Sequence, residues 1–129
     1  MTAPQHRILL AEDEAHIAKL VEFKLTKAGY KIEVALNGAA AVERLKKEPT
    51  GFKLVILDVM MPEMDGWEVL RFIRSDAAFK ALPVLMLTAK GHQKDMANAA
   101  ELGATQFLKK PFDPSELAEL VKRLLGDAA

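Results

Sequence analysis

The segment Leu54-Val55-Ile56-Leu57-Asp58 places four consecutive large apolar residues directly before a carboxylate. A short continuous apolar run is typical of a strand buried on both faces, as in a parallel sheet that helices cover. An ionised carboxylate at the end of such a strand is costly to bury unless it is exposed, paired or bound to a metal. The segment therefore predicts a central parallel strand and indicates a functional carboxylate at its end.

Similar apolar runs recur along the chain and alternate with longer stretches that have the spacing of helices. Five βα units in this order, joined by right-handed crossovers, imply a parallel sheet with helices on both faces. We therefore predict an α/β fold with a doubly wound, five-stranded parallel sheet. The candidate strands are Ile8–Leu10, Ile32–Ala35, Leu54–Leu57, Val84–Leu87 and Phe107–Leu108.

Capping residues and apolar spacing predict the helices between these strands. The first helix ends at Gly29, the second begins after Asn37, the third begins at Asp65, and the last runs from Asp113-Pro114 to Gly126. A fourth helix, from about His92 to Leu102, has few large apolar residues, so we expect it to be the most mobile. The first helix is expected to turn five residues inward: Ile17, Leu20, Val21, Leu25 and Ala28.

The composition excludes several classes of protein. The 129 residues contain no cysteine, which excludes disulfides, thiolate zinc sites and cysteine nucleophiles. Eighteen basic residues balance eighteen acidic ones, so direct nucleic-acid binding is disfavoured. The sequence has neither a signal peptide nor an apolar run long enough to cross a membrane, and we expect a cytoplasmic protein without membrane contact.

Polar and charged side chains follow the predicted strands: Glu12 and Asp13 after the first, Asp58 after the third, Thr88 after the fourth, and Lys110 after the fifth. Ligand sites in doubly wound folds lie at the carboxyl ends of the strands. Singly, the first two carboxylates are equally consistent with a helix N-terminus, and the lysine with a solvated surface residue. Together, three converging carboxylates repel one another unless a cation such as Mg²⁺ binds them.

Four motifs at successive strand ends, namely 9–14, 57–66, 87–89 and 110–112, together resemble the receiver domain of two-component response regulators, the CheY-like superfamily. The resemblance covers about Arg7 to Leu125. It implies a flavodoxin-like (βα)5 sheet with strand order 2-1-3-4-5. We expect residues 1–6 to form a flexible N-terminal tail, 7–126 the receiver domain, and 127–129 a C-terminal tail.

By this resemblance the chain is a phosphorylation-dependent signalling switch rather than an enzyme. Asp58 would be the phosphoacceptor, and its donor a histidine kinase or histidine phosphotransfer protein. Asp13, Asp58 and the Met60 backbone carbonyl would bind Mg²⁺, while Glu12 would contribute directly or through water. Thr88 and Lys110 would contact the phosphoryl group.

The resemblance also implies a route for the response. Phe107 occupies the switch position, where many receivers have tyrosine, and Thr88 would act together with it. The output protein would bind the face formed by the fourth helix, fifth strand and fifth helix, and phosphorylation-dependent dimerisation stays open. Met60 and Lys90 flank the path of the attacking water, and since neither can accept its proton, we expect a long-lived phosphorylated state.

Two alternatives stay open at this point. One is an aspartate-nucleophile phosphohydrolase, which would need an acid where the chain has Met60. The other is a receiver that binds partners without phosphorylation. The sequence does not favour it, because the acidic residues, Thr88 and Lys110 are all present. The sequence does not distinguish a whole gene product, whose output would be a protein contact, from a receiver domain that is part of a longer regulator.

Overall fold

The computed structural model describes residues 6–89, 101 and 103–126. The predicted fourth helix, apart from Glu101, lies outside the described residues, as do Lys90 and the two chain ends, 1–5 and 127–129.

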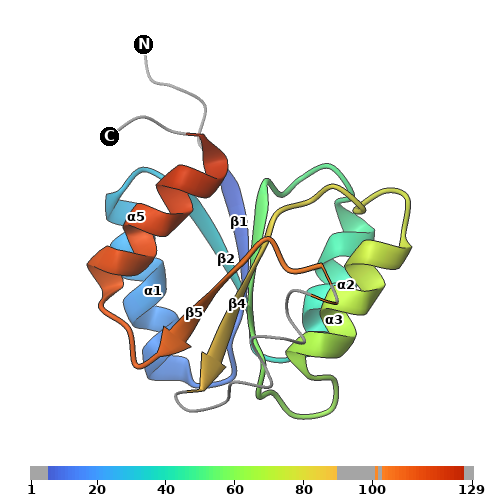
Figure 1. Cartoon of the computed structure of the whole chain (residues 1–129), viewed down its shortest axis with the longest axis horizontal. Helices are drawn as coiled ribbons and strands as arrows, with labels where there is room; N and C mark the ends of the chain where they lie inside the picture. The colour runs from blue at the N-terminus through green and yellow to red at the C-terminus, as the bar shows by residue number, and fades with distance from the viewer. Residues whose placement is uncertain (1–5, 90–100, 102, 127–129) are drawn as a thin grey trace.

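A single five-stranded sheet forms the centre of the described structure, with all strands parallel and in the order β2-β1-β3-β4-β5 (Figure 1). This order confirms the predicted flavodoxin-like topology, in which the chain reverses direction across the sheet after β2. The strands are β1 (Arg7–Ala11), β2 (Lys31–Ala35), β3 (Leu54–Asp58), β4 (Val84–Ala89) and β5 (Gln106–Lys110).

The register of the strands brings their carboxyl ends to one edge of the sheet. Ala11 of β1 pairs with Leu57 of β3, so the next residue of each segment, Glu12 and Asp58, lies at the same level of the sheet. Across the other side of β3, Asp58 pairs with Leu87 of β4. The residues that follow β1 therefore meet the end of β3, and this edge is where the functional side chains gather.

Helices cover both faces of the sheet: α1 (Ala15–Lys27) and α5 (Pro114–Leu125) lie on one face, α2 (Gly38–Lys47) and α3 (Gly66–Ser75) on the other (Figure 1). Strand residues alternate between the two cores that result. In β1, Ile8 and Leu10 pack toward α1 and α5, and Leu9 and Ala11 toward α2 and α3. Both faces of β1, β3 and β4 are thereby buried, as the continuous apolar runs predicted.

The capping predictions are confirmed. Asn37 Oδ1 accepts a hydrogen bond from the Ala40 N–H at 2.8 Å, and Asp65 forms a reciprocal capping box with Glu68. The Asp113 side chain accepts from the Ser115 N–H at 2.8 Å, with Pro114 in the first turn of α5. Helix α5 ends at Gly126, whose φ of 72° is the left-handed conformation that favours glycine.

One predicted core residue is wrong. Leu20 of α1 is 50% exposed, whereas Ala18, Val21 and Leu25 form the buried stripe of that helix. The stripe passes through the small Ala18, which lies about 200° around the helix from Leu20, so both cannot face the sheet. Because Leu20 is apolar, hydropathy alone predicts a buried stripe that is rotated away from the observed one.

Candidate functional site

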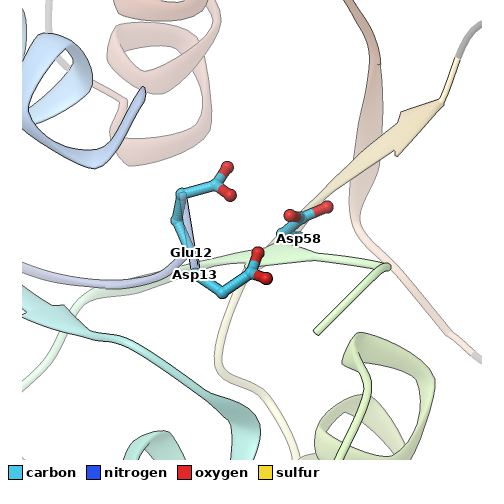
Figure 2. A group of neighbouring side chains, drawn as sticks. All are labelled: Glu12, Asp13 and Asp58. Atoms are coloured by element: carbon cyan, nitrogen blue, oxygen red, sulfur yellow. The ribbon is translucent and has the colours of Figure 1, made fainter. Parts of the chain in front are cut away.

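Three carboxylates from two neighbouring strands converge at the carboxyl edge of the sheet (Figure 2). Glu12 and Asp13 follow β1, Asp58 ends β3, and one ligand oxygen from each lies within 4.8 Å of the others. Glu12 is 0% exposed and Asp58 3% exposed, while Asp13 is exposed. A cluster with this concentration of negative charge and only oxygen donors fits a hard divalent cation such as Mg²⁺.

Lys110 at the end of β5 supplies the positive charge of the site. Its Nζ donates a hydrogen bond to Asp58 Oδ2 at 3.0 Å and lies 3.0 Å from Glu12 Oε1 in an ion pair. β5 and β3 are separated by β4 in the sheet, so the long lysine side chain spans a strand to reach the cluster. One ammonium thus partly neutralises two buried carboxylates.

The charges perturb the protonation of this cluster. Burial, followed by the neighbouring Asp58, raises the pKa of Glu12 to about 7, although contact with Lys110 opposes the rise. The pKa of Lys110 is raised as well: burial lowers it, but its contacts with Glu12 and Asp58 outweigh that effect. The metal-free site therefore keeps a proton near neutral pH, which a bound divalent cation would displace.

Thr88 of β4 is fully buried, and its Oγ1 has no hydrogen-bond partner among the described residues. It lies one residue beyond Leu87, the partner of Asp58, and pairs with Lys109, the neighbour of Lys110. Leaving a buried hydroxyl unpaired costs roughly 1–3 kcal/mol. The structure thus retains a free donor on the strand between the carboxylate and the ammonium.

The loop after β3 holds Asp58 in place. The Met60 N–H donates to Asp58 Oδ1 at 3.2 Å, while the Met60 side chain is 65% exposed. The loop closes when the Gly66 N–H donates to Val59 O at 3.0 Å. A Cβ on Gly66 would lie 2.4 Å from the Asp58 carbonyl oxygen, so only glycine fits where α3 begins against the end of β3.

Phe107 of β5, the residue at the predicted switch position, pairs with Met86 of β4 and is partly buried against the core under α2 and α3. It therefore lies on the strand that carries Lys110 and next to the strand that carries Thr88. Lys90 lies outside the described residues, so the structure does not place it.

One residue of this edge lies within the 9–14 motif but received no predicted role. Glu14, the N-cap residue of α1, is half exposed, and its Oε1 lies 3.9 Å from Lys110 Nζ. The signal that could have indicated a role was its position immediately after Asp13, in the same strand-end loop.

No helix among the described residues has the length and apolarity that crossing a bilayer requires.

Comparison with known proteins agrees with this geometry. Residues 8–122 match the response regulator receiver domain family. The transcriptional regulatory protein GltR of Pseudomonas aeruginosa is 39% identical over 128 residues, which cover 99% of this chain and 52% of GltR. The chain thus spans about half the length of the curated relatives that it matches first.

Solved structures show the same relation. The chemotaxis response regulator CheY4 of Vibrio cholerae aligns with a TM-score of 0.87 and 33% identity, covering 95% of this chain and 100% of that one. The receiver domain of a sensor histidine kinase from Pseudomonas aeruginosa, with a magnesium ion coordinated in its active site cleft, aligns with a TM-score of 0.85 and 28% identity over 96% of this chain and 100% of that one. Sequence and fold thus agree: the chain belongs to the response regulator receiver domain family.

Proposed function

We propose that this receiver domain accepts a phosphoryl group on Asp58 from a histidine kinase or histidine phosphotransfer protein and thereby changes its protein-binding surface. The observation that carries the proposal is the environment of Asp58. This carboxylate is almost fully buried, bonded to Lys110, and next to two further carboxylates from the end of β1. A group this costly to bury is expected to be retained for chemistry rather than for stability.

Mg²⁺ fits the acidic cluster, and we propose that Asp13, Asp58 and the Met60 carbonyl hold it, with Glu12 contributing directly or through water. When bound, the ion would offset the negative charge that an anionic donor brings toward the carboxylates. The donor set supports this proposal because it consists only of oxygens, the ligand atoms that Mg²⁺ prefers. A similar receiver domain from Pseudomonas aeruginosa has a magnesium ion coordinated in its active site cleft.

The proposed transfer uses Asp58 as the nucleophile. A carboxylate oxygen forms a bond to phosphorus while the bond from phosphorus to the donor nitrogen breaks, and the donor imidazole leaves with the electron pair. Both oxygens of Asp58 are hydrogen-bonded beforehand, Oδ1 by the Met60 N–H and Oδ2 by Lys110, which orients the carboxylate. As the charge moves to the phosphoryl oxygens, the ammonium of Lys110 is near enough to follow it.

The proposed response uses the two donors that the phosphoryl group attracts, Lys110 and the unpaired hydroxyl of Thr88. Hydrogen bonds to charged groups contribute roughly 1.5–3 kcal/mol each, so two of them supply roughly 3–6 kcal/mol. Moving a two-state equilibrium from 1:99 to 99:1 requires about 5.5 kcal/mol. One bond supplies too little free energy for this shift, so the switch requires both contacts to form.

We propose that the response passes from Thr88 to the neighbouring β5. Movement of Thr88 toward the phosphoryl group would vacate space for Phe107, and the face formed by the fourth helix, β5 and α5 would then bind the output protein. We also propose residues 7–126 as the folding unit of the receiver.

A phosphohydrolase is not favoured by the residue two positions after the nucleophile. Hydrolysis of a phosphoester needs an acid to protonate the leaving group, and position 60 carries an exposed methionine. We propose instead that Met60, together with Lys90, slows hydrolysis of the phosphorylated form because neither side chain can accept a proton from water.

The test is intact-mass analysis after treatment with phosphoramidate and Mg²⁺. Wild type should gain one phosphoryl group, whereas Asp58→Asn, or wild type in EDTA, should gain none. Asp113→Asn is the matched control, because asparagine still caps α5 and the substitution removes one carboxylate away from the cluster. Labelling of Asp58→Asn at the wild-type level, or unchanged labelling in EDTA, contradicts the proposal.

A further inference from the structure

Glu14 lies beside the acidic cluster without being part of it. The oxygens that converge belong to Glu12, Asp13 and Asp58, whereas Glu14 is half exposed and lies next to Lys110. One of its oxygens lies 3.9 Å from Lys110 Nζ and the other 3.9 Å from His16 Nε2. Its backbone is fixed beside the cluster, because the Glu14 N–H donates to Glu12 Oε2 at 3.2 Å.

The charges around Lys110 do not balance. Its single ammonium lies 3.0 Å from both Glu12 and Asp58, so Glu14, at 3.9 Å, faces a cation that is already paired with two nearer carboxyl groups. A cation bound by the cluster would neutralise the inner carboxylates and leave Glu14 unneutralised. A fixed negative charge beside the cluster makes the local electrostatic potential more negative, which repels incoming anions, and salt screens this repulsion.

We propose that Glu14 is a specificity-determining residue that selects phosphoryl donors by their charge. It disfavours small dianionic donors such as acetyl phosphate relative to donors whose phosphoryl group is bonded to a protonated nitrogen, such as phosphoramidate. This inference rests on the proposed phosphorylation of Asp58. In both reactions an Asp58 oxygen bonds to phosphorus, and the P–O bond breaks to release acetate or the P–N bond breaks to release ammonia, each with the bonding electron pair.

The experiment compares initial rates of phosphorylation by the two donors, measured by intact mass at saturating Mg²⁺ and fixed pH, at low and high ionic strength. Saturating Mg²⁺ is needed because removing a nearby negative charge also weakens attraction of the cation. The variants are Glu14→Gln and the matched control Glu119→Gln, which removes an exposed carboxylate from the middle of α5.

At low salt, Glu14→Gln should raise the rate with acetyl phosphate by roughly two- to fivefold, the range expected for one exposed charge. The rate with phosphoramidate should rise less, so the ratio of the two rates changes, and high salt should remove the change. Glu119→Gln should keep the wild-type ratio. An unchanged ratio in Glu14→Gln, or the same change in both variants, overturns the inference while leaving phosphorylation of Asp58 intact. Absence of labelling in every protein, wild type included, overturns the proposed function and the inference with it.

Discussion

The protonation of Glu12 predicts that the metal-free domain loses stability as the pH rises through neutrality. Burial raises the pKa of this carboxyl from 4.5 to about 7. Between these two values the unfolded chain releases the proton while the folded chain keeps it. The folded state binds more protons in this window, so the free energy of unfolding falls with rising pH, and the full cost of the buried charge applies above about pH 7.

The size of the effect follows from the shift. Each pKa unit corresponds to about 1.4 kcal/mol, so Glu12 costs up to about 3 kcal/mol above neutral pH. Glu12→Gln removes the titration and keeps the shape of the side chain. Its amide oxygen can still accept the bond that the Glu14 N–H donates to Glu12 Oε2. The variant should therefore be more stable than wild type at pH 8 without metal, and closer to wild type at pH 5.

Urea unfolding followed by circular dichroism at several pH values between about 5 and 8, in EDTA and in excess Mg²⁺, measures this difference. Because a bound cation displaces the proton and neutralises the charge, Mg²⁺ should stabilise wild type more at pH 8 than at pH 6. Glu12→Gln should gain less from Mg²⁺ at pH 8 than wild type does. A wild-type-to-variant difference that stays constant across the pH range, or equal stabilisation by Mg²⁺ at both pH values, would refute the reasoning.

Three further predictions concern the neighbours of Asp58. Thr88→Val should raise the free energy of unfolding by up to about 2 kcal/mol, because it removes a buried hydroxyl that has no partner among the described residues, yet it should lose the conformational response to phosphorylation. If the NMR amide shifts of the variant over residues 90–125 match those of wild type on phosphorylation, the route from Thr88 to Phe107 is contradicted. Gly66→Ala should cost about 1–3 kcal/mol and weaken Mg²⁺ binding, since its Cβ would lie 2.4 Å from the Asp58 carbonyl oxygen; unchanged urea unfolding and Mg²⁺ titration would exclude this clash. Met60→Asn and Lys90→Glu should each lose the phosphoryl group faster than wild type in a mass-spectrometric time course, and equal or slower loss would exclude the water-orientation argument.

The strand order and helix ends could be predicted because the signals for them are local. A buried parallel strand is a continuous apolar run, and a helix start is a single capping residue, as at Asn37 and Asp113. Strand β5 was predicted only over 107–108 but extends over Gln106–Lys110. Its ends are polar because it is an edge strand, so hydropathy did not reveal its full length.

Contacts between distant segments carry no local signal, and the sequence did not reveal them. Arg74 in the last turn of α3 donates from Nε to Gly103 O at 2.7 Å and from Nη1 to Leu82 O at 2.6 Å. These bonds join the segment before β4 to the segment before β5. Arg74 is partly buried, and this burial lowers the pKa of its guanidinium. Nothing in the residues around position 74 indicates which carbonyls such a side chain will reach.

Local chemistry and global fold agree through most of the described structure and conflict at the carboxyl edge of the sheet. There a carboxyl has its pKa raised to about 7, a buried hydroxyl lacks a partner within the described part of the chain, and one ammonium is shared between two buried carboxyl groups. Each of these features costs stability in the metal-free state, and sequences selected for stability alone avoid them. A divalent cation together with a phosphoryl group on Asp58 would relieve all three, because the cation would neutralise the carboxylates and the phosphoryl oxygens would accept from Thr88 and Lys110. The energy that the resting domain forgoes at this edge is therefore available for the conformational change on phosphorylation, which is why we expect the strongest linkage between ligand binding and stability at these residues.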